Sequence, residues 1–149
     1  MLGVRGNPKH ESEMSSSDIR PIDLVIMNLY PFESTVASGA VFDQCVENID
    51  IGGPSMLRSS AKNHAYVAIV TSPTQYSVLI QELMSNEGST SLATRKQFAA
   101  AAFATSASYD SAISAYFAAQ LNESKPPAQI VTRYLSSWNC GFSVFELCN

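Results

Sequence analysis

A chain of 149 residues, 46% of them hydrophobic, is long enough to form one domain with its own core. Only 15% of its residues are charged and its mean hydropathy is +0.02, which excludes an intrinsically disordered class. The net charge is −4 and no basic stripe is present, so we expect no nucleic-acid partner.

The sequence contains no apolar run approaching the roughly 20 residues of a membrane span, so we expect no membrane partner. It starts without the apolar segment of a signal peptide, so we expect a cytosolic protein; a plastid location would require a targeting segment upstream. Three cysteines, Cys45, Cys140 and Cys148, are odd in number and lack metal-type spacing. They are interpreted as reduced thiols, and no metal site is predicted.

The first half of the chain predicts one strand and one short helix. A weak helical turn is expected around Pro8–Met14. The nearly continuous apolar run Ile22–Leu29 predicts a strand that is buried on both faces and ends at Tyr30-Pro31. After a loop, Val41–Ile49 predicts a short helix, with an apolar side formed by Phe42, Cys45, Val46 and Ile49.

A glycine pair gives the sharpest local signal. Gly53 is expected to be the N-cap and Pro54 the first residue of a helix that runs to about Lys62. Glycines at this position allow the backbone to approach a ligand closely and leave N–H groups free. The segment Tyr66–Thr71 then predicts a second buried strand.

The sequence from Ser72 to about residue 121 is predicted to be mainly helical. Ser72-Pro73 is expected to cap a helix that continues to about Asn86 and is closed by Gly88. The Ala-rich stretch 91–121 is also predicted to be helical, as one helix or two. Its apolar seam consists of Phe98, Ala102, Tyr109, Ile113, Tyr116 and Phe117.

Residues 122–149 differ in character, because a linker (NESKPP) precedes an aromatic-rich segment with weak alternation. They are either a docking segment or sequence foreign to the domain, and we favour the second interpretation. The order strand–helix–strand–helix before them predicts an α/β fold, a parallel sheet with flanking helices. Two strands alone cannot form a covered parallel sheet, so we expect the N-terminal part of the sheet to be missing.

Three positions are expected to converge at the carboxyl ends of the strands, where open α/β sheets bind ligands: Asn28–Tyr30, Asp50 and Lys62. A lysine beside a carboxylate is a candidate base. Each residue also has a structural interpretation. Asp50 is equally typical of a helix cap, Lys62 of a partner for the helix dipole, and Tyr30 of a half-buried strand end. His64 is expected to be structural.

Four stretches of the sequence are long and specific: PIDLVIMNLYPF (21–32), TVAS (35–38), VENIDIGGPSMLRSSAKNHAYVAIV (46–70) and YDSAISAYF (109–117). In these stretches, residues 2 to about 121 resemble the cyclohydrolase domain of the AICAR formyltransferase/IMP cyclohydrolase family. We therefore predict a partial cyclohydrolase domain over residues 1–121, a tail over 122–149 that does not match the family, and no formyltransferase domain.

The resemblance implies a methylglyoxal-synthase-like fold that binds the nucleotide FAICAR and closes its ring with loss of water to give IMP. By motif match, the family's proton-transferring lysine falls on Lys62, its aspartate on Asp50 and its tyrosine on Tyr30. The nucleotide-contacting positions fall on Met27, Asn28, Asp50 and Ile51, with Gly52 and Gly53 as the adjacent backbone wall.

The resemblance further implies a homodimer and no cofactor for the cyclohydrolase step, since 10-formyltetrahydrofolate belongs to the formyltransferase domain. Two family segments, a serine-rich phosphate loop (S-x-x-D-K-T-G) and K-T-L-H-P-K-x-H-G-G, are not found. A second catalytic lysine and most phosphate ligands would lie there. We therefore expect nucleotide binding to be severely weakened in this chain alone.

Two functions remain open on the sequence. The chain is either a cyclohydrolase domain that is active only as part of a longer protein, or an inactive truncated relic that at most pairs with full-length subunits. A methylglyoxal-synthase relative acting on triose phosphate is disfavoured by the NLYPF and NIDIGG stretches. We expect the isolated chain to show no turnover and to aggregate or pack loosely.

Overall fold

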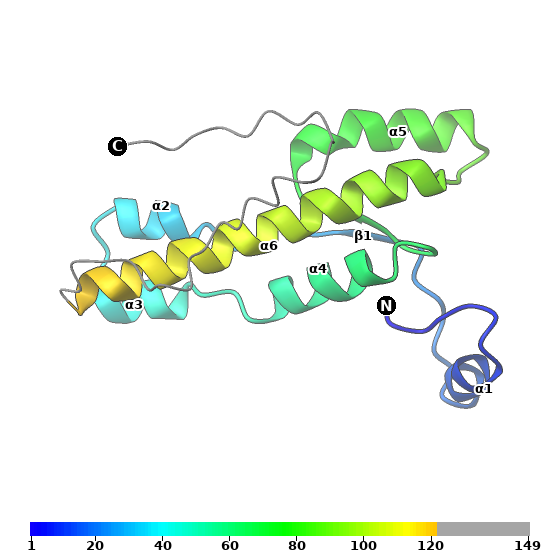
Figure 1. Ribbon diagram of the computed structural model, residues 1–149, viewed down its shortest axis with the longest axis horizontal. Coiled ribbons are helices and arrows are strands. Elements are labelled where there is room, and N and C mark those ends of the chain that lie inside the picture. The colour runs from blue at the N-terminus through cyan, green and yellow to red at the C-terminus, as the bar shows by residue number, and fades with distance from the viewer. Residues whose placement is uncertain (122–149) are drawn as a thin grey trace, which may run out of the picture.

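The computed structural model describes residues 1–121 (Figure 1). The elements in chain order are α1 (Pro8–Ser16), β1 (Leu24–Ile26), α2 (Phe32–Ala37), α3 (Phe42–Glu47), α4 (Gly52–Lys62), β2 (Ala68–Val70), a 3₁₀ turn η1 (Pro73–Gln75), α5 (Tyr76–Ser85) and α6 (Leu92–Gln120). The predicted α/β class is confirmed: two short parallel strands are flanked by helices.

The two strands differ in burial. They pair with Leu24 opposite Ala68 and Ile26 opposite Val70. All of β2 is buried, as predicted, whereas the outer residues Leu24 and Ile26 of β1 are exposed. The prediction of a strand over 22–29 that is buried on both faces is therefore wrong in length and in burial.

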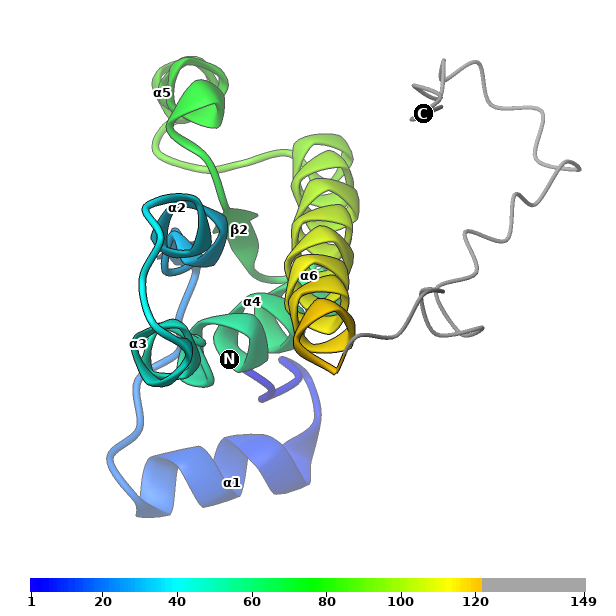
Figure 2. The same ribbon diagram turned by 90° about the vertical axis from the view of Figure 1, so that its left-hand side faces the viewer.

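The physical reason is that the helices cover the sheet unevenly. Val25 and Ile69 point to one face, where α4 and α6 cover them with Leu57 and Ala102. On the other face, α5 packs against Val70 beside β2 and does not extend over β1. Figure 2 shows α4 and α6 on one side of β2 and α5 set off from them. One apolar face of β1 thus remains open.

The core between α4 and α6 depends on small side chains. Ala61 of α4 and Ala99 and Ala102 of α6 are buried, so the two helices approach closely around Leu57 and Ile69. A fully buried leucine or isoleucine of this kind contributes roughly 1.5–3 kcal/mol relative to an exposed one. The α4–α6 pair is therefore the stable frame against which the site is held.

A second cluster joins the short helices to the far end of α6. Phe32 at the start of α2 and Cys45 in α3 are buried against Tyr109. The Phe32 ring meets Tyr109 and Tyr116 edge-on, with centroid distances of 6.3 and 5.5 Å. This buried phenylalanine explains why α2 forms where the sequence predicted a loop.

The helix α3 is shorter than the predicted 41–49 and buries only part of the expected apolar side. Cys45 is buried and Ile49 partly so, whereas Phe42 and Val46 are exposed. The question of one helix or two over 91–121 is answered, because α6 is continuous and contains no glycine or proline. The predicted cap at Ser72 and the closure at Gly88, which has φ of +81°, are confirmed.

The N-terminal segment forms an arm beside the body (Figure 2). Its helix α1 is capped by Asn7, extends slightly beyond the predicted turn and buries no residue. The arm is attached by an ion pair between Arg5 and Asp23 and by Asn63, whose side-chain amide donates to the carbonyls of Met1 and Gly3 at 2.8 and 2.9 Å.

Candidate functional site at the carboxyl edge of the sheet

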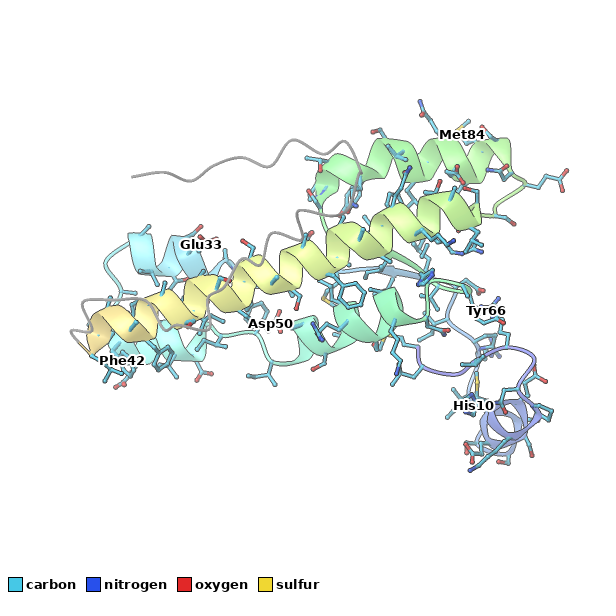
Figure 3. The ribbon with its side chains drawn as sticks, in the orientation of Figure 1. His10, Glu33, Phe42, Asp50, Tyr66 and Met84 are labelled. Carbon is cyan, nitrogen blue, oxygen red and sulfur yellow. The ribbon has the colours of Figure 1, made fainter. Side chains whose placement is uncertain are left out.

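The candidate site lies where β1 ends and α4 begins. The backbone N–H of Met27 still donates to the carbonyl of Val70, at 2.9 Å, and the chain then leaves the sheet through Asn28–Tyr30. After α2 and α3 it returns to the same edge at Asp50, directly before α4 (Figure 3). This is the carboxyl edge of both strands, where ligands bind in open α/β sheets.

The Asp50 carboxylate connects the two chain segments. One oxygen (Oδ1) accepts a hydrogen bond from the N–H of Gly53, at 2.7 Å, and the other (Oδ2) accepts from the N–H of Tyr30, at 3.4 Å. The first bond satisfies a donor that the helix start leaves without an intrahelical partner. The prediction that Gly53 is the N-cap and Pro54 the first helical residue is wrong, since α4 begins at Gly52 and Asp50 supplies the capping oxygen.

The two glycines have different roles. A Cβ placed on Gly53 would lie 2.3 Å from Oδ2 of Asp50, whereas a Cβ on Gly52 would meet nothing within 4 Å. Gly53 is also buried, and Gly52 is exposed. The absence of a side chain at Gly53 is therefore required by Asp50, and only Gly52 presents backbone to open space.

Tyr109 of α6 is a site residue that the sequence interpretation placed in an apolar seam and in the family-like stretch 109–117, without a role at the site. Its hydroxyl accepts a hydrogen bond from the N–H of Asp50 at 2.9 Å and donates one to the carbonyl of Asn48 at 3.3 Å. Burial is the main cause that raises the pKa of Tyr109 above its usual value, so the hydroxyl remains a proton donor at neutral pH. Only the long-range contact reveals this role, and no local sequence signal indicated it.

Lys62 does not join this group. Asp50 precedes the first turn of α4, whereas Lys62 is the last residue of the same 11-residue helix. At 1.5 Å per residue, the helix alone separates their backbones by about 15 Å. The predicted convergence of Lys62 with Asp50 and Asn28–Tyr30 is therefore wrong: a helix that follows a strand runs back along the sheet and ends at its amino edge.

The remaining predicted residues lie around Asp50 with unequal exposure. Met27 is half-buried and packs against the core. Asn28 is exposed, and so are Ile51 and the Tyr30 side chain, at 77% and 56%. Tyr30 contributes its backbone N–H to the site, and its exposed ring is available for a ligand.

Within residues 1–121, the loops that frame Asp50 before α4 carry no positive side chain. The sequence contains no Lys, Arg or His between Arg20 and Arg58, and the segments that form this edge lie in that interval or after β2. The Asp50 carboxylate also neutralises the positive end of the α4 dipole. These loops therefore offer a ligand polar groups and no cation of their own. Within residues 1–121, no cluster of His, Cys, Asp and Glu side chains has the arrangement of a metal site.

Two cavities in the described part of the chain lie away from Asp50. One, of about 400 Å³, lies between the arm and the body and is lined by Met14, Ile22 and Val67 among others. The other, of about 590 Å³, lies at the amino edge beside Tyr66 and Arg95. Their linings do not include the residues that the site uses, so the geometry of Asp50 is the better guide to function.

The amino edge is held by structural contacts. Arg95 donates to the carbonyls of His64 and Ala65, at 3.0 Å each. The His64 ring nitrogen Nδ1 lies 3.1 Å from the carbonyl of Ala61. One His64 ring nitrogen thus has a backbone partner, and its structural role remains a prediction.

Comparison with known families gives two matches along the chain. The model of the AICARFT/IMPCHase bienzyme matches residues 60–139, and the model of the MGS-like domain matches residues 3–55. The first match extends past residue 121, where the tail was predicted to begin. Residues 122–149 lie outside the described structure, so the division at 121 remains a prediction.

Curated relatives carry the name bifunctional purine biosynthesis protein PurH. The chain is 55% identical over 126 residues to that of Mesorhizobium japonicum and 48% identical over 126 residues to that of Rhodospirillum rubrum. It is 48% identical over 137 residues to that of Brucella canis. These alignments cover 85%, 85% and 92% of this chain but only 23%, 24% and 26% of the relatives.

A solved structure, the crystal structure of ForH, is similar with a TM-score of 0.65 and 30% identity. The alignment covers 79% of this chain and 61% of that one. In residues 1–121, no helix has both the length and the apolarity needed to cross a bilayer.

Proposed function

This chain belongs to the AICARFT/IMPCHase bienzyme family, and on that premise we propose that it contributes the carboxyl-edge site of an IMP cyclohydrolase. Residues 1–121 form the partial cyclohydrolase domain of this proposal. The substrate is FAICAR and the product is IMP, formed in the cytosol without a cofactor, and a second copy of the chain is the protein partner.

The chemistry requires two protein groups. The carboxamide nitrogen of FAICAR attacks the formyl carbon, a C–N bond forms, the formyl oxygen gains a proton, and water then leaves. A carboxamide nitrogen is a weak nucleophile, so a base that removes its proton contributes roughly 10²–10⁴-fold. Donors aimed at the formyl oxygen stabilise the charge that develops there.

The observation that supports the proposal is the arrangement of Asp50 between Tyr30 and Gly53. It joins NLYPF to NIDIGG, the two stretches that carry the family resemblance, at the edge of the sheet where ligands bind. The exposed residues Asn28, Ile51 and Gly52 border the same edge. The loops before α4 carry no cation between Arg20 and Arg58, which suits the uncharged carboxamide and formyl groups of the substrate.

Lys62 lies apart from the other proposed site residues. The resemblance assigns the proton transfer to it, yet α4 holds the backbones of Lys62 and Asp50 about 15 Å apart. We propose Asp50 and Tyr30 as the contacts to the nucleotide base at this edge. The proton-transfer role of Lys62 is tested independently of theirs.

A second function is favoured by one observation, the open face of β1. Leu24 and Ile26 are exposed, as is Ile22 before them. An apolar strand that is unpaired on its outer edge is a surface for pairing with another chain. The alternative is therefore an inactive chain that binds full-length subunits through β1.

A chimera tests the two functions. The 126 residues of the M. japonicum protein that match this chain would be replaced by those of this chain, and conversion of FAICAR to IMP would be measured, with the unaltered relative as the positive control. The isolated chain is expected to show no conversion and the chimera to show conversion. A folded chimera without turnover would contradict the enzymatic proposal.

Point variants in the chimera assign the roles. Asp50→Ala is expected to lower turnover at least 100-fold, and Lys62→Ala by about 10²–10⁴-fold if it is the base. The matched control is Lys96→Ala, which removes an exposed lysine from α6. Equal rates for Lys62→Ala and Lys96→Ala would exclude Lys62, and an unchanged rate for Asp50→Ala would exclude the proposed site.

A further inference from the structure

We infer that Tyr109 of α6 is a positioning residue, which fixes the orientation of Asp50 and, through it, of the Tyr30 and Gly53 backbone. The inference depends on the proposed function only in treating this edge as the nucleotide site. The Tyr109 hydroxyl bonds to the 48–50 turn and not to the backbone of Tyr30 or Gly53, so its effect on those two passes through Asp50.

The turn 48–50 is held by Tyr109. The Asn48 carbonyl and the Asp50 N–H, on either side of this turn, both bond to the Tyr109 hydroxyl, which accepts at 2.9 Å and donates at 3.3 Å. The Tyr109 hydroxyl therefore satisfies one N–H and one carbonyl of the turn, as a neighbouring strand does in a sheet. Because α6 is packed on α4, this contact ties the turn to the stable frame.

The Asp50 side chain is held by two further segments. Its backbone N–H is held by α6, while its two carboxylate oxygens are held by Gly53 at the start of α4 and by Tyr30 after β1. Three segments distant in the sequence thus meet on one residue. If the backbone of Asp50 is released, the carboxylate is no longer directed at both N–H groups, so the effect is expected to reach Tyr30 and Gly53.

The chain offers a matched control in Tyr116. Both tyrosines lie on α6, and both rings meet Phe32 edge-on. The neighbouring Cys45 side chain is the main cause that raises the pKa of Tyr116, and the Tyr116 hydroxyl does not take part in the hydrogen bonds of the 48–50 turn. Replacing either tyrosine by phenylalanine keeps the ring and removes only the hydroxyl.

The experiment is amide hydrogen exchange on the full 149-residue chain, read by NMR. In Tyr109→Phe, the amide of Asp50 is expected to lose about tenfold protection, the loss typical of one hydrogen bond. The amides of Tyr30 and Gly53, which Tyr109 does not touch, are expected to lose protection as well. In Tyr116→Phe all three are expected to keep their protection, and the β2 amides are expected to be unchanged in both variants.

Three outcomes would overturn the inference. In the first, only the Asp50 amide loses protection, which would show that the hydroxyl has no effect beyond the bond it makes itself. In the second, both variants expose the three amides equally, which would indicate a general packing effect. In the third, Tyr109→Phe changes none of them. The readout needs no nucleotide, so its failure is distinguishable from failure of the proposed function.

A second variant covers the case in which Tyr109→Phe does not fold. Phe32→Leu removes the ring that Tyr109 packs against but leaves both hydroxyl bonds in place. It is expected to lower the urea midpoint while the Asp50 amide remains protected relative to its neighbours. Loss of Asp50 protection in proportion to overall stability would contradict the positioning role.

Discussion

The two ends of α4 carry the two residues that sequence motifs single out most strongly, and they are built differently. At its start, Asp50 is held by three hydrogen bonds from three parts of the chain. At its end, Lys62 is exposed, and the neighbouring Asn63 is the residue that is tied down, by the arm. Figure 3 shows Asp50 at one end of α4 and Tyr66 beyond the other.

This contrast teaches that closeness in a motif is not closeness in space. Twelve residues separate Asp50 from Lys62 in the sequence, and a continuous helix turns that spacing into opposite edges of the sheet. Asp50 and Tyr30 are 20 residues apart and are joined by a hydrogen bond, because β1 ends and α4 begins at the same edge of the sheet. The following predictions test this contrast, beginning with the largest expected effect.

Gly53→Ala is expected to be the most damaging single change at the start of α4. The new Cβ would lie 2.3 Å from Oδ2 of Asp50, so the carboxylate must move and its bonds to Tyr30 and Gly53 weaken. We expect the free energy of unfolding to fall by about 2–4 kcal/mol, in the range of overpacked or uncapped sites. Urea unfolding of the chain measures it.

The matched control is Gly52→Ala, whose Cβ meets nothing within 4 Å. It is expected to be neutral or to stabilise the chain by about 0.5–1 kcal/mol, since alanine restricts the unfolded backbone more than glycine does. If both alanine variants lose the same free energy of unfolding, the helix start, and not contact with Asp50, is the reason for glycine at position 53.

Asp50→Ala removes the oxygens that cap α4 and hold Tyr30. The loss is expected to be about 1–2 kcal/mol in the free energy of unfolding, typical of a lost helix cap. Asp43→Ala, an exposed acid in the first turn of α3, is the control and is expected to lose less. If the two variants are equally stable, the carboxylate of Asp50 does not clamp the site.

Lys62→Ala is expected to change the free energy of unfolding by no more than about 0.5 kcal/mol. The side chain is exposed, and its expected contribution is a favourable interaction with the α4 dipole. The same denaturant series measures it. A loss as large as that of Asp50→Ala would contradict the contrast between the two ends.

The smallest expected effect is a change in the pH dependence of stability, caused by Glu82, which lies outside the candidate site. Hydrogen bonds from Ser91, chiefly from its backbone N–H, hold the pKa of Glu82 below its ordinary value of 4.5. A carboxyl group with a lowered pKa in the folded state adds stability above about pH 4.5, and that stability is lost as the pH falls through the folded pKa. Glu82→Gln is therefore expected to flatten the acid limb of the stability curve, and Glu87→Gln to leave it unchanged.

How far the sequence predicted the molecule depends on the range of the contacts involved. The α/β class, β2, the end of α4 at Lys62 and the caps at Ser72 and Gly88 follow from local periodicity and turn chemistry, and they are confirmed. The burial of β1 was wrong because it depends on which helices reach each face of the sheet. That arrangement is not encoded in the apolar run itself.

The site shows the same division. The position of Asp50 before a helix predicted a cap, and the structure shows one, although the helix begins one residue before Gly53. The role of Tyr109 was missed because its partner lies 59 residues away, and neither of the two stretches indicates which distant residue it contacts. The placement of Lys62 failed because convergence was inferred from a motif without the direction of the helix.

The most direct test of the account is a titration of the ¹⁵N-labelled 149-residue chain with IMP up to millimolar concentration. We expect the amide signals of Tyr30, Asp50, Gly52 and Gly53 to shift together, and those of Lys62 and Asn63 to remain in place. Shifts centred on Lys62 and Asn63, or none around Asp50 at the highest concentration, would contradict a nucleotide site at the carboxyl edge of the sheet.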